Sequence, residues 1–207
     1  MTHPGDVGWY AEVHVWSKQY NASLTPGLDS TSMNNVMEAL KVENPEAWDN
    51  ATTLVHGDFR LDNMILREDQ PAVAAVLDWE LCVPAAGWCA GVGSHPRCVY
   101  ACAGRSTIGH PLADLAHSML PYHLPHIPNS PVTGFGMPNE ELSAAGLPSE
   151  EEFVRKYVAC LASHLSNHRS DFTPPEEWLH ITESGLPKNW HFFTSFALFR
   201  VAAILQV

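Results

Sequence analysis

Basic residues are scarce in this sequence, and long apolar runs are absent. Lysine and arginine together number 11 against 23 aspartates and glutamates, which gives a formal net charge of −12. This charge argues against a nucleic-acid-binding protein and against binding to an anionic membrane surface. No run approaches the roughly 18 apolar residues of a membrane span, and the first residues lack the basic and apolar regions of a signal peptide. We therefore expect a soluble, intracellular protein without a membrane span.

Cysteine is also scarce. The chain of 207 residues holds five cysteines, an odd number that favours reduced thiols over a disulfide framework. Four of them are Cys82, Cys89, Cys98 and Cys102, whose spacing lacks the paired short intervals of structural zinc sites. Free thiols are the favoured interpretation, and a zinc site is the alternative. The histidines are scattered, and we expect His117, His123 and His126 to be solvated surface residues.

The apolar content of 45% is typical of one globular domain, which we place at residues 1–207. Apolar residues recur at helical spacing over several stretches, whereas short β-branched runs predict strands between them. The expected helices are 9–20, 31–40, 110–119, 149–165, a short one at 173–183, and 190–205. The expected strands are 52–55, 64–66 and 73–77. This mixture predicts an α+β fold. Residues 83–106 have no clear period and predict an irregular insertion, and the prolines of 121–148 predict a long surface loop.

The chemistry-bearing residues cluster in 55–63 and 77–80. Phosphoryl transfer needs a carboxylate that orients the attacking hydroxyl, oxygen ligands for Mg²⁺ and a cation near the phosphoryl group. Asp58 could be that carboxylate, Asn63 and Asp78 the Mg²⁺ ligands, and Arg60 the cation. The alternative is an ordinary turn in which Asp58 and Asn63 are turn formers.

These residues carry a family resemblance. His56-Gly57-Asp58-Phe59-Arg60-Leu61-Asp62-Asn63 and Val76-Leu77-Asp78-Trp79-Glu80 resemble the catalytic and metal-binding motifs of the aminoglycoside phosphotransferase and choline kinase superfamily, which has the protein-kinase fold. Further blocks at 16–20, 111–116 and 199–206 resemble the phosphotransferase-like domain of acyl-CoA dehydrogenase family members 10 and 11.

The resemblance implies an ATP- and Mg²⁺-dependent kinase that acts on a small-molecule hydroxyl, with 4-hydroxyacyl-CoA as the leading candidate. It implies catalytic roles for Asp58 and Arg60, and cofactor binding by His56, Asn63 and Asp78, of which Asn63 and Asp78 hold the metal. For Asp114 it leaves open a structural anchoring role and a catalytic one. The resemblance is compatible with two compartments, the mitochondrion and the peroxisome.

The sequence departs from the family in its nucleotide-binding parts. The family's N-terminal lobe has a Gly-rich strand-turn-strand and a strand lysine. Here no Gly-rich hairpin precedes the catalytic motif. Each lysine lies in or beside a predicted helix; the lysines are Lys18, Lys41, Lys156 and Lys188. We therefore expect mainly the helical C-lobe of a kinase-like fold, with the N-lobe absent. Its expected partners are a small hydroxylated substrate and either a missing N-lobe or a fused acyl-CoA dehydrogenase domain. The alternative function is a catalytically incomplete, pseudokinase-like fragment or substrate-binding module.

Overall fold

The computed structural model describes residues 9–27, 29–43, 53–79, 107–110, 112–130, 132–168 and 180–205. Its fold is α+β, with several helices and two separate antiparallel sheets of two strands each. The predicted α+β class is therefore confirmed. The predicted insertion at 83–106 and the four spaced cysteines, Cys82 included, lie outside the described residues. Most of the predicted helix 173–183 also lies outside them, and the prediction is wrong for its described end, 180–183, where Ile181 instead pairs with Pro187 in a β-bridge.

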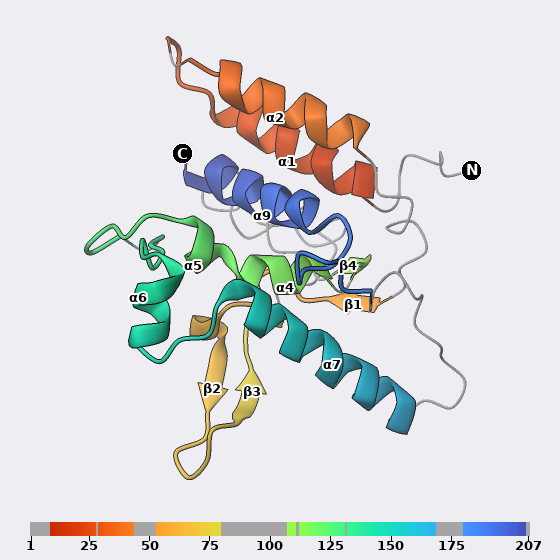
Figure 1. Cartoon of the computed structure of the whole chain (residues 1–207). Helices are drawn as coiled ribbons and strands as arrows, with labels where there is room; N and C mark the ends of the chain where they lie inside the picture. The colour runs from red at the N-terminus through yellow and green to blue at the C-terminus, as the bar shows by residue number, and fades with distance from the viewer. Residues whose placement is uncertain are drawn as a thin grey trace.

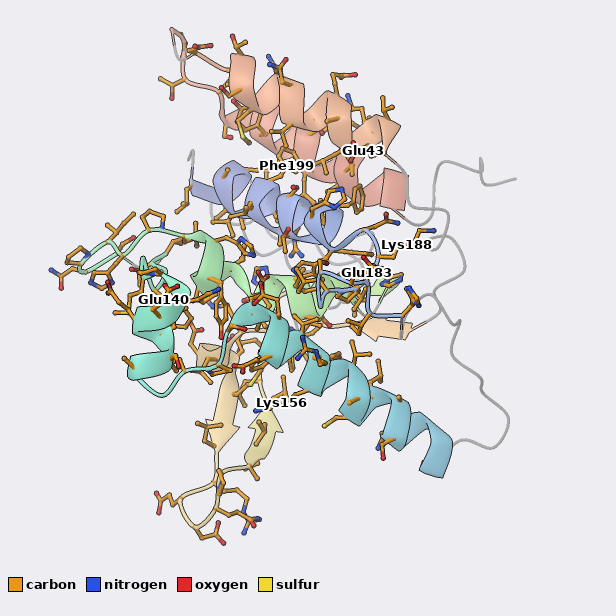
Figure 2. All side chains as sticks on the ribbon, viewed as in Figure 1. Glu43, Glu140, Lys156, Glu183, Lys188 and Phe199 are labelled. Carbon is orange, nitrogen blue, oxygen red and sulfur yellow. The ribbon has the colours of Figure 1, made fainter. Side chains whose placement is uncertain are left out.

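The core is built around the last helix. Helix α9 (Trp190–Leu205) contacts α1 (Trp9–Ser23) and α2 (Thr31–Val42) on one side and α4 (Leu112–Ser118) on another (Figure 1). Its aromatic side chains are almost fully buried, and Figure 2 shows Phe199 between α9 and the α1–α2 pair. Each such side chain contributes about 1.5–3 kcal/mol of burial free energy. The sequence prediction of a helix buried on most sides is confirmed.

The first helix buries one face against this core. Val13, Trp16 and Tyr20 are each at most 5% exposed, and they lie on the face that their spacing predicts. The paired helix α2 buries Met37 and Leu40 in the same way. The two N-terminal helices therefore form a layer over α9 on the side away from α4 (Figure 1).

The strands form two small sheets that flank the predicted catalytic motif. Strand β2 (Met64–Leu66) and β3 (Val73–Val76) form the predicted antiparallel hairpin, which projects away from the α1–α2 layer (Figure 1). Strand β1 (Thr53–Val55) instead pairs with β4 (Thr107–Gly109). Sequence patterns did not predict β4, because three residues are too few to show a period and the partner strand is distant in the chain.

The segment 121–148 contains short helices. α5 (Leu120–His123) enters it, and α6 (Asn139–Ala144) begins after Pro138 with two glutamates in its first turn, where the helix dipole favours negative charge. The burial of Leu142, 2% exposed, holds α6 on the body of the protein. The prolines alone predict a long surface loop, whereas the structure has short helices within this segment.

Helix α7 (Glu150–His168) begins with the predicted capping box. The Glu152 amide donates to Ser149 Oγ at 3.2 Å, and the Ser149 amide donates to Glu152 Oε2 at 3.1 Å.

Among the residues that the structure describes, no helix is long and apolar enough to cross a membrane.

Candidate active site

The predicted catalytic motif forms a loop between β1 and β2, and its backbone is anchored by α4. Asp114 accepts hydrogen bonds from the backbone amides of His56 at 2.7 Å and Gly57 at 2.8 Å. Gly57 has a φ of +84°, which side-chain-bearing residues rarely adopt, so glycine is required at this turn. Of the two roles left open for Asp114, this geometry favours the anchoring role.

His56 links the loop to the segment that carries Asp78. Its ring is 1% exposed, and Nε2 lies 2.8 Å from the carbonyl oxygen of Leu77. A carbonyl only accepts, so Nε2 carries the proton, and Nδ1 is then free to accept the Asp58 amide at 3.2 Å. Trp79 packs on the same ring with centroids 4.6 Å apart. These contacts make His56 a residue that positions Asp58 and Leu77.

Asp58 is held by hydrogen bonds to both carboxylate oxygens. His117 Nε2 donates to Oδ1 at 3.0 Å, and Asn63 Nδ2 donates to Oδ2 at 2.9 Å. Burial acts to raise the pKa of Asp58, but the contributions of His117, Asn63 and Arg60 outweigh it and lower the pKa to about 2. The carboxylate is therefore ionised at neutral pH and fixed in orientation.

The prediction that His117 is a solvated surface residue is wrong. Its side chain is 7% exposed, because α4 turns this residue toward the catalytic loop. Burial lowers the pKa of His117, although its hydrogen bond to Asp58 acts in the opposite direction. The ring is therefore neutral at pH 7 and donates its single proton to Asp58 through Nε2. His126 is exposed as predicted, and His123 contacts Glu150 at 2.8 Å.

Asn63 and Asp78 come together at one end of the β2–β3 hairpin. Met64 pairs with Val76, and the Leu77 amide donates to the Asn63 carbonyl at 2.8 Å, so Asp78 directly follows the residue bonded to Asn63. Asp78 is exposed and has a φ of +63°, a conformation that is uncommon for residues other than glycine, although asparagine and aspartate adopt it more often than most. Such a residue often marks a functional site, because the surrounding structure must hold it there.

Arg60 is paired with a neighbouring carboxylate. Its Nε donates to Asp62 Oδ1 at 2.8 Å and its Nη2 donates to Asp62 Oδ2, with the Arg60 side chain 41% exposed. An exposed pair of this kind contributes little to stability. The guanidinium also lowers the pKa of Asp58, which places it near that carboxylate, and it remains accessible to solvent.

Two further residues fasten the loop, and sequence reasoning gave neither a role. Ser118 Oγ donates to the Phe59 carbonyl at 2.6 Å, and Arg200 of α9, 7% exposed, donates through Nη2 to the Gly57 carbonyl. Arg200 also lies over the ring of Trp16, 5.1 Å from its centroid. The available signal was the helical spacing of Asp114, His117 and Ser118, which places all three on one face of α4.

The donor set fits Mg²⁺ in its chemistry. Mg²⁺ is bound in proteins by one or two carboxylates together with water and phosphate oxygens. Asn63 directs its amide nitrogen at Asp58, which leaves Oδ1 as the atom able to bind a cation, and the exposed carboxylate of Asp78 follows at the same hairpin end. Among the described residues, no group of three histidines, cysteines or acidic residues could hold a metal by itself.

None of the four lysines lies on a described strand. Lys18 lies on α1 and Lys41 on α2, while Figure 2 shows Lys156 on α7 and Lys188 in the segment before α9. None of them has the strand position of the lysine that contacts nucleotide phosphates in kinases. Within the described ranges, Arg60 lies on the predicted catalytic loop and Arg200 donates to its backbone.

Comparison with known proteins finds similarity to phosphotransferases. Residues 2–86 match the model of the phosphotransferase enzyme family. A solved structure from Ralstonia eutropha, described as an aminoglycoside phosphotransferase, superposes with a TM-score of 0.60 at 27% identity, over 99% of this chain and 46% of that one. The chain is therefore a relative of the aminoglycoside phosphotransferases, as its motifs indicated.

The chain is also similar to two acyl-CoA dehydrogenase family members. It is 34% identical over 195 residues to mouse acyl-CoA dehydrogenase family member 10, a match that covers 94% of this chain and 13% of the relative. The human family member 11 is 33% identical over 195 residues, with 94% of this chain and 18% of the relative covered. The chain thus spans less than a fifth of the length of these curated relatives.

Proposed function

We propose that this chain carries the catalytic loop of an ATP- and Mg²⁺-dependent phosphotransferase that acts on a small-molecule hydroxyl group. The observation that carries the proposal is the placement of Asp58. Its carboxylate is ionised, both oxygens accept hydrogen bonds, and it lies on the loop that leads into the hairpin end bearing Asn63 and Asp78. Phosphoryl transfer depends on this kind of positioning more than on covalent chemistry.

In this proposal Asp58 orients the acceptor hydroxyl. A carboxylate with a pKa near 2 is a weak base, so its contribution is to accept the hydrogen bond of the hydroxyl and direct the oxygen toward the phosphoryl group. The hydroxyl proton moves to the carboxylate only late, as the oxygen loses its basicity on bonding to phosphorus. Such a role needs a fixed carboxylate, which the contacts from α4 and Asn63 supply.

Asn63 and Asp78 would hold Mg²⁺, which neutralises phosphate charge when it is bound with the nucleotide. Arg60 would release Asp62 and place its guanidinium near the transferred phosphoryl group, because an exposed ion pair is easily exchanged. His56 was predicted to bind the cofactor. Its two buried hydrogen bonds support an indirect part, in which it sets the spacing between Asp58 and Leu77.

We further propose that residues 1–207 form one domain equivalent to the helical C-lobe of a kinase-like fold. The coverage of 46% of the Ralstonia structure supports this, together with the absence of a lysine from the described strands. A nucleotide-binding lobe, or a domain of the acyl-CoA dehydrogenase type, would then be its partner. The similarity to acyl-CoA dehydrogenase family members supports a hydroxyacyl-CoA acceptor, with 4-hydroxyacyl-CoA as the first to test.

A transfer assay tests the proposal. The purified chain is incubated with γ-labelled ATP, Mg²⁺ and 4-hydroxyacyl-CoA, alone and with the N-lobe of an aminoglycoside phosphotransferase added as a separate chain. The same acyl-CoA without the hydroxyl is the substrate control, and Asp58→Asn is the variant control. Label that reaches only the hydroxylated thioester, and only with Asp58 present, supports the proposal. Absence of transfer in both arrangements would favour the catalytically incomplete module.

A further inference from the structure

The contact between α4 and the Asp58 carboxylate goes beyond what the catalytic motif contains. His117 lies 59 residues after Asp58 in the sequence and donates to Oδ1 at 3.0 Å. The second oxygen, Oδ2, accepts from Asn63 at 2.9 Å. Two donors on the two oxygens of one carboxylate fix the torsion angles of that side chain as well as its position.

His117 itself is held firmly. It is 7% exposed and lies between Asp114, whose carboxylate accepts two loop amides, and Ser118, whose hydroxyl donates to the Phe59 carbonyl. These neighbours fix the distance between α4 and the loop on both sides of the imidazole. The ring nitrogen Nδ1 is buried and has no hydrogen-bond partner among the described residues, which costs free energy that a purely apolar residue would not.

That cost indicates what His117 does. An apolar side chain would fill this place between helix and loop without leaving a buried polar atom unsatisfied. We propose that His117 is a positioning residue, whose Nε2–H holds the Asp58 carboxylate in the single rotamer that phosphoryl transfer uses. The catalytic role of His117 rests on the proposed function, whereas the rotamer of Asp58 can be measured without any turnover.

Two amide substitutions separate the hydrogen bond from the packing. The Gln side chain places Nε2 where imidazole Nε2 lies, whereas Asn is one methylene shorter and cannot reach Asp58. His117→Gln therefore keeps the donor, and His117→Asn keeps the polarity but loses the contact. His191→Leu, at an exposed histidine on α9, is the matched control outside the site.

Three-bond Hα–Hβ couplings of Asp58, measured by NMR on the full chain, report the rotamer directly. We expect one χ1 rotamer in the unchanged chain, in His117→Gln and in His191→Leu, and averaged couplings in His117→Asn. If His117→Asn does not fold, His117→Leu replaces it, with thermal unfolding as the check on both. A single Asp58 rotamer in the folded variant that lacks the donor would overturn the proposal.

Kinetics then test the catalytic meaning. Loss of the donor should lower kcat about 10- to 100-fold with little change in KM for ATP, because a small displacement of a positioned group has this effect. His117→Gln should restore kcat to within about threefold of the unchanged chain. A donor-free variant with averaged Asp58 couplings and unchanged kcat would refute the positioning role. Absence of turnover in the unchanged chain would instead count against the proposed function, and the couplings would still decide the structural claim.

Discussion

The two ends of the candidate site are held in opposite ways. At the Asp58 end, His56 and His117 are each at most 7% exposed, and helix α4 fastens the loop backbone. At the Asp78 end, the carboxylate is exposed, its backbone has a φ of +63°, and the neighbouring Trp79 is 43% exposed. The protein thus prearranges the group that would orient the acceptor and leaves open the end where metal and nucleotide would arrive.

The largest expected effect is on activity at the open end. Asparagine adopts positive φ readily, so Asp78→Asn removes the charge without disturbing the backbone. Loss of a metal ligand's charge should lower kcat/KM about a thousandfold, or about 4 kcal/mol, while the free energy of unfolding changes by less than about 0.5 kcal/mol. Steady-state kinetics and urea denaturation measure the two quantities. An Asp78→Asn variant of full activity would contradict the metal role.

The next effect is on stability at the anchored end. Asp114→Ala leaves the His56 and Gly57 amides without their acceptor, and hydrogen bonds to a charged group contribute about 1.5–3 kcal/mol each. We expect a loss of about 3 kcal/mol in the free energy of unfolding, the lower limit for two such bonds, and a smaller loss for Asp114→Asn, which retains one acceptor oxygen. Urea denaturation of both variants tests this. Equal stability of the Asp114→Ala variant and the unchanged chain would show that the loop does not depend on α4.

A pH effect of similar size is expected beside α4. Burial lowers the pKa of His110 to about 4, and its Nδ1 accepts the Leu112 amide at 3.2 Å at the start of this helix. The unfolded chain, with a histidine pKa near 6.5, binds a proton that the folded chain excludes, so stability is full above pH 6.5 and falls toward pH 4. The loss is about 3 kcal/mol, because each pKa unit corresponds to about 1.4 kcal/mol. Denaturation curves at about pH 7.5, 5.5 and 3.5, which bracket this window, measure it.

His110→Asn is the matched variant for this prediction. The shorter amide can still accept the Leu112 amide, as a helix N-cap does, but it does not titrate. The decline between pH 6.5 and 4 should therefore become shallower without vanishing, since burial also lowers the pKa of His117. His123 acts in the opposite sense through Glu150, which raises its pKa, but its side chain is 29% exposed and its effect is smaller. An unchanged slope in His110→Asn would contradict the assignment.

The smallest effect is expected at the tip of the hairpin. Arg67 and Asp69 form an exposed ion pair at 2.8 Å, and pairs of this kind contribute little. Asp69→Asn should change the free energy of unfolding by less than about 0.5 kcal/mol and leave activity unaltered. Asp69→Asn is the control for the Asp114 variants. Each substitution removes one carboxylate, but only the carboxylate of Asp114 holds the loop backbone. A large loss of stability in Asp69→Asn would mean that this exposed ion pair does stabilise the fold.

The contrast between the two ends also explains what could be predicted from the sequence. The helices α1, α2, α7 and α9 and the β2–β3 hairpin follow from local patterns, because their periods, caps and turn residues lie within each segment. That Asn63 and the segment of Asp78 meet could be predicted for the same reason, since the hairpin joins nearby stretches of chain. The site roles of Asp58, Asn63 and Asp78 stay predictions.

The contacts that fix Asp58 could not be predicted in this way. His117, Ser118 and Arg200 reach the loop only after α4 and α9 pack together, and no local period reports on such long-range contacts. His117 in particular lies at the end of a helix before a proline-rich segment, where a histidine is usually exposed. The pairing of β1 with β4 was missed because its register depends on residues distant in the chain.

A nucleotide titration tests whether Asp78 holds the Mg²⁺ that binds with ATP. ATP is titrated by calorimetry into the chain with and without Mg²⁺, alone and with a separately supplied N-lobe, and the series is repeated with Asp78→Asn. We expect ATP binding that depends on Mg²⁺ and that loses this dependence when Asp78 is replaced. ATP that fails to bind in every arrangement, or that binds equally with and without Mg²⁺, would contradict this expectation.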